Sequence, residues 1–236
     1  MAELFVDLHI HSCLSPCADK LMTPGNIVGM AFLKGLDAIA VCDHNTMGNL
    51  AAVKAAADMM GVVLLPGIEV TTREEVHVLC YFPDMERALP FGAYIYEHLP
   101  DFKNNAAFFG RQIYMNEQDE EIGEEKKLLI SATDLSMGEV ARACRAHGGA
   151  FVPAHIGRAS NGALGVLGFL PPDIDYDALE ISGGHVEEKT LSSLMKKFNC
   201  LRSSDAHRLE DISEKIFSLD ATNCTSYSIF CSIKSK

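Results

Sequence analysis

Short apolar runs that are typical of buried strands alternate along the chain with stretches that carry apolar residues at helical spacing. The helix expected over residues 23–35 has Thr23 as its N-cap, Pro24 at its first position and Gly35 as its stop. This alternation predicts an α/β fold with a parallel sheet, open or closed into a barrel. The expected strands cover residues 4–11, 36–42, 62–70, 75–82, 150–155, 178–181, 200–207 and 216–221, and the expected helices residues 23–35, 48–61, 134–149, 186–198 and 225–234.

The middle of the chain departs from this regular pattern. Residues 100–127 read "PDFKNNAAFFGRQIYMNEQDEEIGEEKK", and the second half of this stretch is rich in charge. Such a segment is typical of a solvated surface insertion or a lid rather than of a separate domain. We therefore expect a single domain over residues 1–236 with an insertion at about 100–127.

Histidines and carboxylates gather where the expected strands end. His9 and His11 close the first strand, and alternate residues of a strand point to the same face, so both imidazoles aim at one place. Each polar residue alone has an ordinary explanation, as a core histidine, a turn or a cap. In a barrel, however, the carboxyl ends of the strands converge on one face. The joint placement of these polar residues at strand ends therefore predicts a metal site. Besides His9 and His11, its expected members are His44, Glu69, His77, His155, Asp205 and His207.

Composition and charge limit the class of protein. The chain has 236 residues, 48% of them hydrophobic, and a formal net charge of −12. This charge repels phosphate at long range, so we expect no binding of a long nucleic acid through a basic surface. No apolar run is long enough to cross a membrane, and the N-terminus lacks a secretory signal. These features indicate a cytoplasmic protein.

The eight cysteines are spread widely and form no CxxC pair. Without a secretory context, reduced thiols are the better interpretation. Cys42, Cys80 and Cys144 lie in apolar runs, so we expect them in the core.

At the strand ends that carry these histidines and carboxylates, the chain resembles the PHP family of polymerase and histidinol phosphatase metal-dependent phosphoesterases. The resemblance covers about residues 5–208. The motifs are "DLHIHS", "AVCDHN", "PGIEVT", "EVHVLCYF", "GGAFVPAH" and "SSDAH". The resemblance implies a distorted (β/α)7 TIM-like barrel with two or three divalent ions of manganese, zinc or iron, a trinuclear centre when complete. It also implies hydrolysis of a small phosphorylated substrate or nucleotide by a metal-activated hydroxide.

The same resemblance implies how the ligands divide among three metals. One metal takes His9, His11, Glu69 and Asp205, and Glu69 bridges to a second metal. The second metal takes His77 and His155, and the third takes His44, His207 and one residue from the loop after the first strand.

Two departures from the family pattern concern that loop and the region after His155. The loop reads "SPCAD", with Pro16 where the family has an aspartate, so either Asp19 or Cys17 completes the third site. Arg158 in "AHIGR" is a candidate clamp for a substrate phosphate, with an ordinary loop arginine as the alternative. Arg208, beside His207, has a weaker claim to the same role.

The catalytic residues expected from this scheme are Glu69, Asp205, His207 and His185, with His207 or His185 as the proton donor to the leaving group. Asp7 and Asp43 orient imidazoles or else bond to backbone.

Two other functions compete with the phosphoesterase. An amidohydrolase-type metallohydrolase also carries an H-x-H on its first strand, but it usually needs a bridging lysine, and no lysine stands at a suitable strand end. The other is a metal-stabilised regulatory or polymerase-associated module without turnover, which a full set of ligands disfavours. No pattern indicates an oligomeric state.

Overall fold

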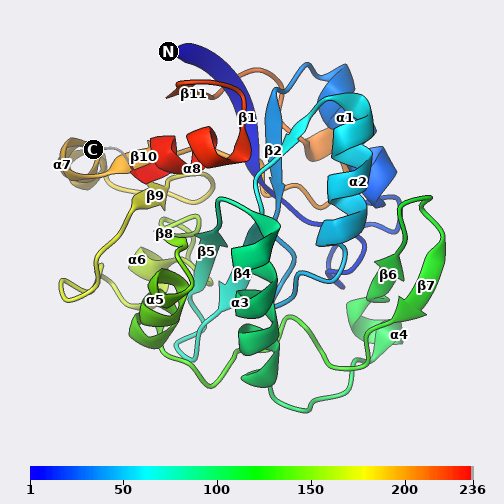
Figure 1. Cartoon of the computed structure of the whole chain (residues 1–236). Helices are drawn as coiled ribbons and strands as arrows, with labels where there is room; N and C mark the ends of the chain where they lie inside the picture. The colour runs from blue at the N-terminus through cyan, green and yellow to red at the C-terminus, as the bar shows by residue number, and fades with distance from the viewer. Residues whose placement is uncertain (235–236) are drawn as a thin grey trace.

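The structure, a computed structural model, describes residues 1–234 and shows strands and helices alternating along the chain (Figure 1). The strands are β1 (Ala2–Ile10), β2 (Ala38–Val41), β3 (Val63–Leu64), β4 (Gly67–Thr71), β5 (His77–Tyr81), β6 (Ile113–Met115), β7 (Glu121–Glu124), β8 (Ala150–Pro153), β9 (Ala178–Glu180), β10 (Asn199–Leu201) and β11 (Ser218–Ala221). The helices are α1 (Pro24–Leu33), α2 (Leu50–Met60), α3 (Met85–Glu97), α4 (Ala106–Phe109), α5 (Met137–Ala146), α6 (Ala163–Val166), α7 (Glu188–Lys197) and α8 (Ser226–Lys234), with a 3-10 turn at Leu209–Asp211.

Local signals in the sequence set the helix ends. The Thr23 side chain accepts a hydrogen bond from Asn26 N and caps α1, as its position predicts. Gly61 ends α2 in the left-handed conformation that glycine adopts without strain. Ser136 forms a capping box with Glu139 at the start of α5.

The sheets are partly parallel, as expected, and partly antiparallel. β1, β2 and β3 pair in parallel, whereas β5 runs antiparallel to both β4 and β8, and β11 runs antiparallel to β1. The turn between Thr71 and His77 is too short for the crossover that a parallel pair needs, so β4 and β5 form a hairpin. The strand expected over residues 62–70 breaks at Pro66 into β3 and β4.

Isolated bridges join these sheets near the strand ends. His44 pairs with Glu69, Ile10 with Ala206, and Gly157 with Gly184, all in parallel. The strand ends are thereby held beside one another. Within residues 1–234 the strand ladders form four separate sheets, and no ladder closes these sheets into a barrel.

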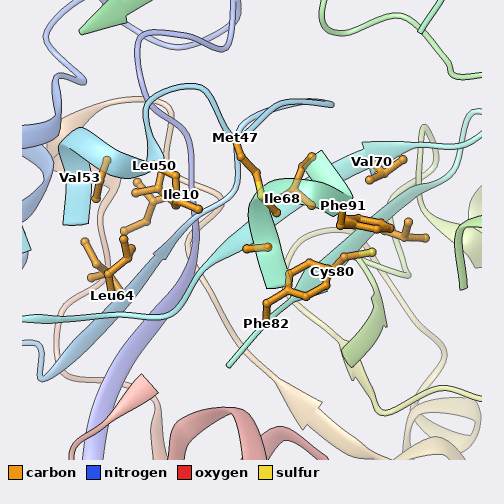
Figure 2. Packing of buried hydrophobic residues seen from close by; sticks show 14 of the residues in the cluster. Ile10, Met47, Leu50, Val53, Leu64, Ile68, Val70, Cys80, Phe82 and Phe91 are labelled. Carbon is orange, nitrogen blue, oxygen red and sulfur yellow. The ribbon is translucent and has the colours of Figure 1, made fainter. Parts of the chain in front are cut away.

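The core packs the apolar faces of strands and helices together. Figure 2 shows Ile68 and Cys80, from β4 and β5, beside Phe91 of α3, with Ile10 and Leu64 from β1 and β3 nearby. All five residues are at least 98% buried. The cysteines expected in the core, Cys42, Cys80 and Cys144, are fully buried there, and all eight cysteines are free thiols.

The insertion forms α4 and the hairpin β6–β7, which stands at one side of the molecule near α2 (Figure 1). Its attachments are specific. Asn49, before α2, donates to Ile113 O (3.0 Å) and accepts from Met115 N (2.9 Å). Asp119 accepts from Thr23 Oγ1 at 2.6 Å, at the start of α1. These bonds attach the segment to the starts of α1 and α2, and its outer face is exposed and charged.

No helix within residues 1–234 is long and apolar enough to span a membrane.

Candidate metal centre

His9, on β1, and His11, directly after the end of β1, bring their imidazoles together, as the spacing predicts. Both side chains are fully buried, and their Nε2 atoms lie 3.2 Å apart. Asp205 Oδ1 lies 3.3 Å from His9 Nε2 and 3.1 Å from His11 Nε2. One ligand atom from each of these three residues lies within 4.8 Å of the other two, close enough to share a metal ion.

Glu69, on β4, stands at the centre of a second group. Its Oε1 lies 3.0 Å from His77 Nδ1 and 3.1 Å from His155 Nε2. Its Oε2 lies 3.1 Å from His44 Nδ1. The carboxylate also lies 3.4 Å from the Nε2 atoms of His9 and His11, so it faces the first group as well.

A third group consists of His11, His44 and His207. The ring centroid of His11 lies 4.5 Å from that of His44 and 4.3 Å from that of His207. The three groups share members, so they form one compact cluster rather than separate sites. We call the eight residues His9, His11, His44, Glu69, His77, His155, Asp205 and His207 the strand-end cluster.

Glu180 orients His9 from behind, and sequence reasoning missed it. Its Oε2 lies 3.1 Å from His9 Nδ1 and accepts from His155 N at 2.8 Å. A proton held on Nδ1 leaves Nε2 free to bind a metal. Glu180 is fully buried at the end of β9, so a carboxylate at the end of an apolar strand was the available signal.

Ser15 orients His11, with help from Asp43. The Ser15 hydroxyl donates to Asp43 Oδ1 (2.7 Å), so its oxygen accepts the proton of His11 Nδ1 (3.1 Å). Asp43 also accepts from Ser12 N (2.7 Å). Asp43 therefore acts on His11 through Ser15, and we find it bonded to this loop rather than to the imidazole of His44.

Asp7 bonds to the segment that carries Asp205. It accepts from Ser204 N (3.0 Å), Ser204 Oγ (2.6 Å) and Ser213 N (2.8 Å). Of the two roles left open for Asp7, the structure shows the bonding to backbone.

The backbone is strained at two members of the cluster. His155 has φ 27° and Asp205 has φ 55°, a region that non-glycine residues seldom adopt. Such residues concentrate at functional sites, where the surrounding structure holds them.

The charges of the cluster shift the pKa of both carboxylates in the same direction. Burial alone would raise the pKa of Glu69, but the facing imidazoles, His77 first, hold it well below its usual range. For Asp205, His9 and His11 likewise outweigh burial and hold the pKa low. Both carboxylates are therefore ionised and suited to bind cations.

Two of the histidines are held neutral. Burial, followed by the positive charge of His11, lowers the pKa of His207 to about 4. Burial also lowers the pKa of His44 well below its usual value. A neutral imidazole is the form that binds a metal.

Arg158 contacts a member of the cluster directly. Its Nη1 lies 2.7 Å from Asp205 Oδ2, while Asp205 Oδ1 faces the imidazoles of His9 and His11. A Cβ at Gly183 would lie 2.9 Å from Arg158 Nε, so this glycine leaves room for the guanidinium. The Arg158 side chain is 41% exposed and keeps donors open to the solvent.

The other predicted residues lie outside the three groups. Asp19 is exposed, and its carboxylate accepts from Leu21 N at 2.8 Å. Arg208 shares a small cavity with Asp19. His185 is exposed on a turn, where its backbone N donates to Gly157 O.

Cys17 is exposed but lies near the cluster. Desolvation of its thiol, and then the charges of Glu69 and Asp205, raise its pKa to about 12. The thiol is therefore protonated near neutral pH, and a thiolate there would need a cation beside it.

The donor set fits divalent metal ions. Six imidazoles and two carboxylates converge, and imidazole and carboxylate ligands suit zinc, iron and manganese. The Nε2 atoms of His9 and His11 face each other, and the buried His44 Nδ1, although 3.1 Å from Glu69 Oε2, makes no hydrogen bond of suitable geometry. Such lone pairs, gathered around carboxylates, are costly unless a cation satisfies them.

No model of a known protein family matches the chain. A 5′-3′ exoribonuclease of Haemophilus influenzae is 33% identical over 76 residues, which is 31% of this chain and 27% of that protein. A 3′,5′-nucleoside bisphosphate phosphatase of Chromobacterium violaceum is 35% identical over 77 residues, 31% of this chain and 26% of that protein. The matches thus cover about a quarter of each relative's length.

Solved structures resemble the whole chain. A lesion-specific endonuclease of Pyrococcus furiosus has a TM-score of 0.72 at 20% identity, over 99% of this chain and 56% of its own. A protein of Bifidobacterium adolescentis described as a metal-dependent phosphoesterase has a TM-score of 0.60 at 19% identity, over 98% of this chain and 96% of its own. At these identities they show the fold alone. The chain thus shares its fold with these neighbours, and its resemblance to the PHP family rests on the sequence motifs.

Proposed function

We propose that the protein is a metal-dependent phosphoesterase that hydrolyses a small phosphorylated substrate or a nucleotide. The observation that carries this proposal is Glu69, buried and within 3.4 Å of five imidazoles. The relatives named as phosphatase, phosphoesterase and nucleases support the same class of reaction.

We assign the metal ligands to the strand-end cluster. His9, His11 and Asp205 would hold one ion, and Glu69 would bridge it to a second held with His77 and His155. His44 and His207 would hold a third, completed by Asp19 or Cys17. When bound, such ions lower the pKa of water and neutralise phosphate charge. The strands that carry these ligands would form the barrel that the resemblance implies.

Arg158 binds the substrate phosphate in this proposal. Asp205 Oδ2 and the space at Gly183 hold its guanidinium beside the cluster, with donors left over. A planar guanidinium suits a phosphate better than an ammonium does, because it donates two parallel hydrogen bonds. His207 or His185 supplies the proton to the leaving group, and Arg208 is a second candidate for phosphate.

The net charge of −12 favours a small substrate over a long nucleic acid. Two of the similar proteins are nevertheless named as nucleases. A nucleic-acid end, or a short oligonucleotide, is therefore the second candidate substrate, and it would use the same cluster.

Phosphate release from a panel of phosphoesters tests the proposal. Metal-stripped protein is assayed alone and after addition of manganese, zinc or iron. We expect hydrolysis to return with one or more of these metals. Metal binding without hydrolysis of any phosphoester or short oligonucleotide would favour the module without turnover, and hydrolysis of amides only would favour the amidohydrolase.

A further inference from the structure

A cavity of about 540 Å³ lies between the loop after β1 and the hairpin β6–β7. Its lining is mostly apolar and includes the buried Cys13 and Ile113, the half-buried Ala18 and the exposed Leu21. Leu21 is 54% exposed, so its apolar side chain is accessible to a ligand. The volume lies within the range of small-molecule sites, which are mostly apolar with a few polar groups.

The polar groups of the cavity stand at its rim. Lys20 lines it, and within the described residues no side-chain hydrogen bond or ion pair engages its ammonium. Across the rim, Arg111 donates to the Glu121 carboxylate at 3.0 Å. The cavity thus offers a free cation and a fixed carboxylate beside an apolar floor.

The cavity adjoins the strand-end cluster through the loop after β1. Asp19 N donates to the backbone carbonyl of His207 at 2.8 Å, and the preceding residue, Ala18, lines the cavity. Adjacent Cα atoms are about 3.8 Å apart, so the wall of the cavity is close to a cluster residue. On the other side, Gly110 packs on Pro16 so tightly that a Cβ there would collide with the Pro16 carbonyl.

The wall that the insertion supplies is held in place. Ile113 N donates to Cys13 O at 3.0 Å, across the cavity floor, and Asn49 holds Ile113 O from the other side. A preformed cavity binds a ligand without the entropy cost of ordering a loop. The insertion is therefore better suited to shape a binding site than to close over one.

We propose that this cavity binds the flat, ring-bearing half of the substrate, such as a nucleobase, while the phosphate lies at the strand-end cluster. This subsite rests on the proposed function. The apolar walls cover the ring, the Glu121 carboxylate accepts from a ring amine, and the Lys20 ammonium donates to a ring nitrogen or carbonyl of the base.

Equilibrium binding of AMP and of ribose 5-phosphate to the metal-loaded protein tests the subsite, because the two probes differ only in the base. We expect AMP to bind about tenfold more tightly or better. Ala18→Trp fills the cavity and should remove most of this preference while leaving the affinity for ribose 5-phosphate unchanged. Leu33→Trp, on an exposed face of α1, adds the same indole away from the cavity and should leave both affinities unchanged.

Lys20→Glu and Lys189→Glu form a second matched pair. Both change the net charge equally, but Lys189 lies on α7, outside the cavity. We expect only Lys20→Glu to weaken the binding of AMP, by about fivefold. Because Lys20 is exposed, this variant should fold even if Ala18→Trp does not.

Equal affinity of the wild-type protein for the two probes, or an unchanged preference in Ala18→Trp that folds and retains its metal, would overturn the subsite. Neither result touches the proposed function, which fails only if no phosphoester is hydrolysed. Preferential binding of AMP without hydrolysis of any phosphoester would support the subsite and contradict the proposed phosphoesterase activity.

Discussion

The strand-end cluster and the hairpin β6–β7 both set carboxylates against positively charged groups, but they do so in opposite surroundings. Glu69 is 1% exposed and Asp205 4%, whereas Glu121, which pairs with Arg111, is 44% exposed. Water solvates the hairpin pair and weakens its attraction, so it contributes little to stability. In the cluster, removal of one partner leaves a buried charge or lone pair without compensation. Burial, more than residue type, separates a metal centre from a surface ion pair.

The largest effect should come from the centre of the cluster. Glu69→Gln keeps the shape of the side chain but removes the charge that faces five imidazoles. We expect phosphoesterase activity to fall about a thousandfold, since charge stabilisation at the reacting group is lost. Glu124→Gln, the same change on the hairpin, should leave kcat/KM unaltered. Equal losses in both variants would erase the distinction between the two regions.

Glu180→Gln tests a residue that touches the cluster only from behind. We expect metal affinity to fall about 10- to 100-fold, because Gln orients His9 less well and makes it a weaker base. Titration of metal-stripped protein, followed by elemental analysis, measures this. Unchanged affinity would mean that the Glu180–His9 contact does not support metal binding.

Arg158→Lys should raise KM for the substrate about tenfold, with a smaller change in kcat, because Lys cannot bind a phosphate through two parallel hydrogen bonds. Steady-state kinetics at saturating metal separates the two constants. A change in metal content without a change in KM would instead assign Arg158 to positioning Asp205.

The metal-free protein should lose stability as the pH rises above neutral. Burial disfavours the charged form of His11, but Asp205 and Glu69 outweigh it and raise the pKa from 6.5 to about 9. A base whose pKa is higher in the folded state stabilises the fold below its unfolded pKa, and this stability disappears as the pH passes the folded pKa. We therefore expect the free energy of unfolding to fall between about pH 6.5 and pH 9. Denaturant titrations across this range measure it, and a flat profile would contradict the pairing.

The smallest effect is expected on the hairpin. Glu124→Gln removes a contact with Arg111 that lies at the surface, so we expect no measurable change in the melting temperature. A clear drop would show that the surface pairs also stabilise the fold.

Local patterns made much of this molecule predictable from the sequence. Thr23 and Gly61 end helices through their own chemistry, and His9 and His11 share a face because strands alternate. The antiparallel course of β5 escaped prediction because the β4–β5 connection, not the strand sequence, sets its direction.

Contacts between distant residues were harder to foresee. Glu180 meets His9 across 171 positions, and no local pattern distinguishes a buried carboxylate with a partner from one at the end of a strand that faces water. Asp43 was expected either at its sequence neighbour His44 or on the backbone, and the loop after β1 brings the backbone of Ser12 and the hydroxyls of Ser12 and Ser15 to it.

Metal content shows directly whether the strand-end cluster binds divalent metal ions. Wild-type protein and Glu69→Gln are stripped of metal, incubated with manganese, zinc or iron, and freed of excess ion before elemental analysis. We expect two or three ions per wild-type chain and fewer in the variant. A wild-type chain that retains no ion after this treatment would show that the strand-end cluster does not hold metal.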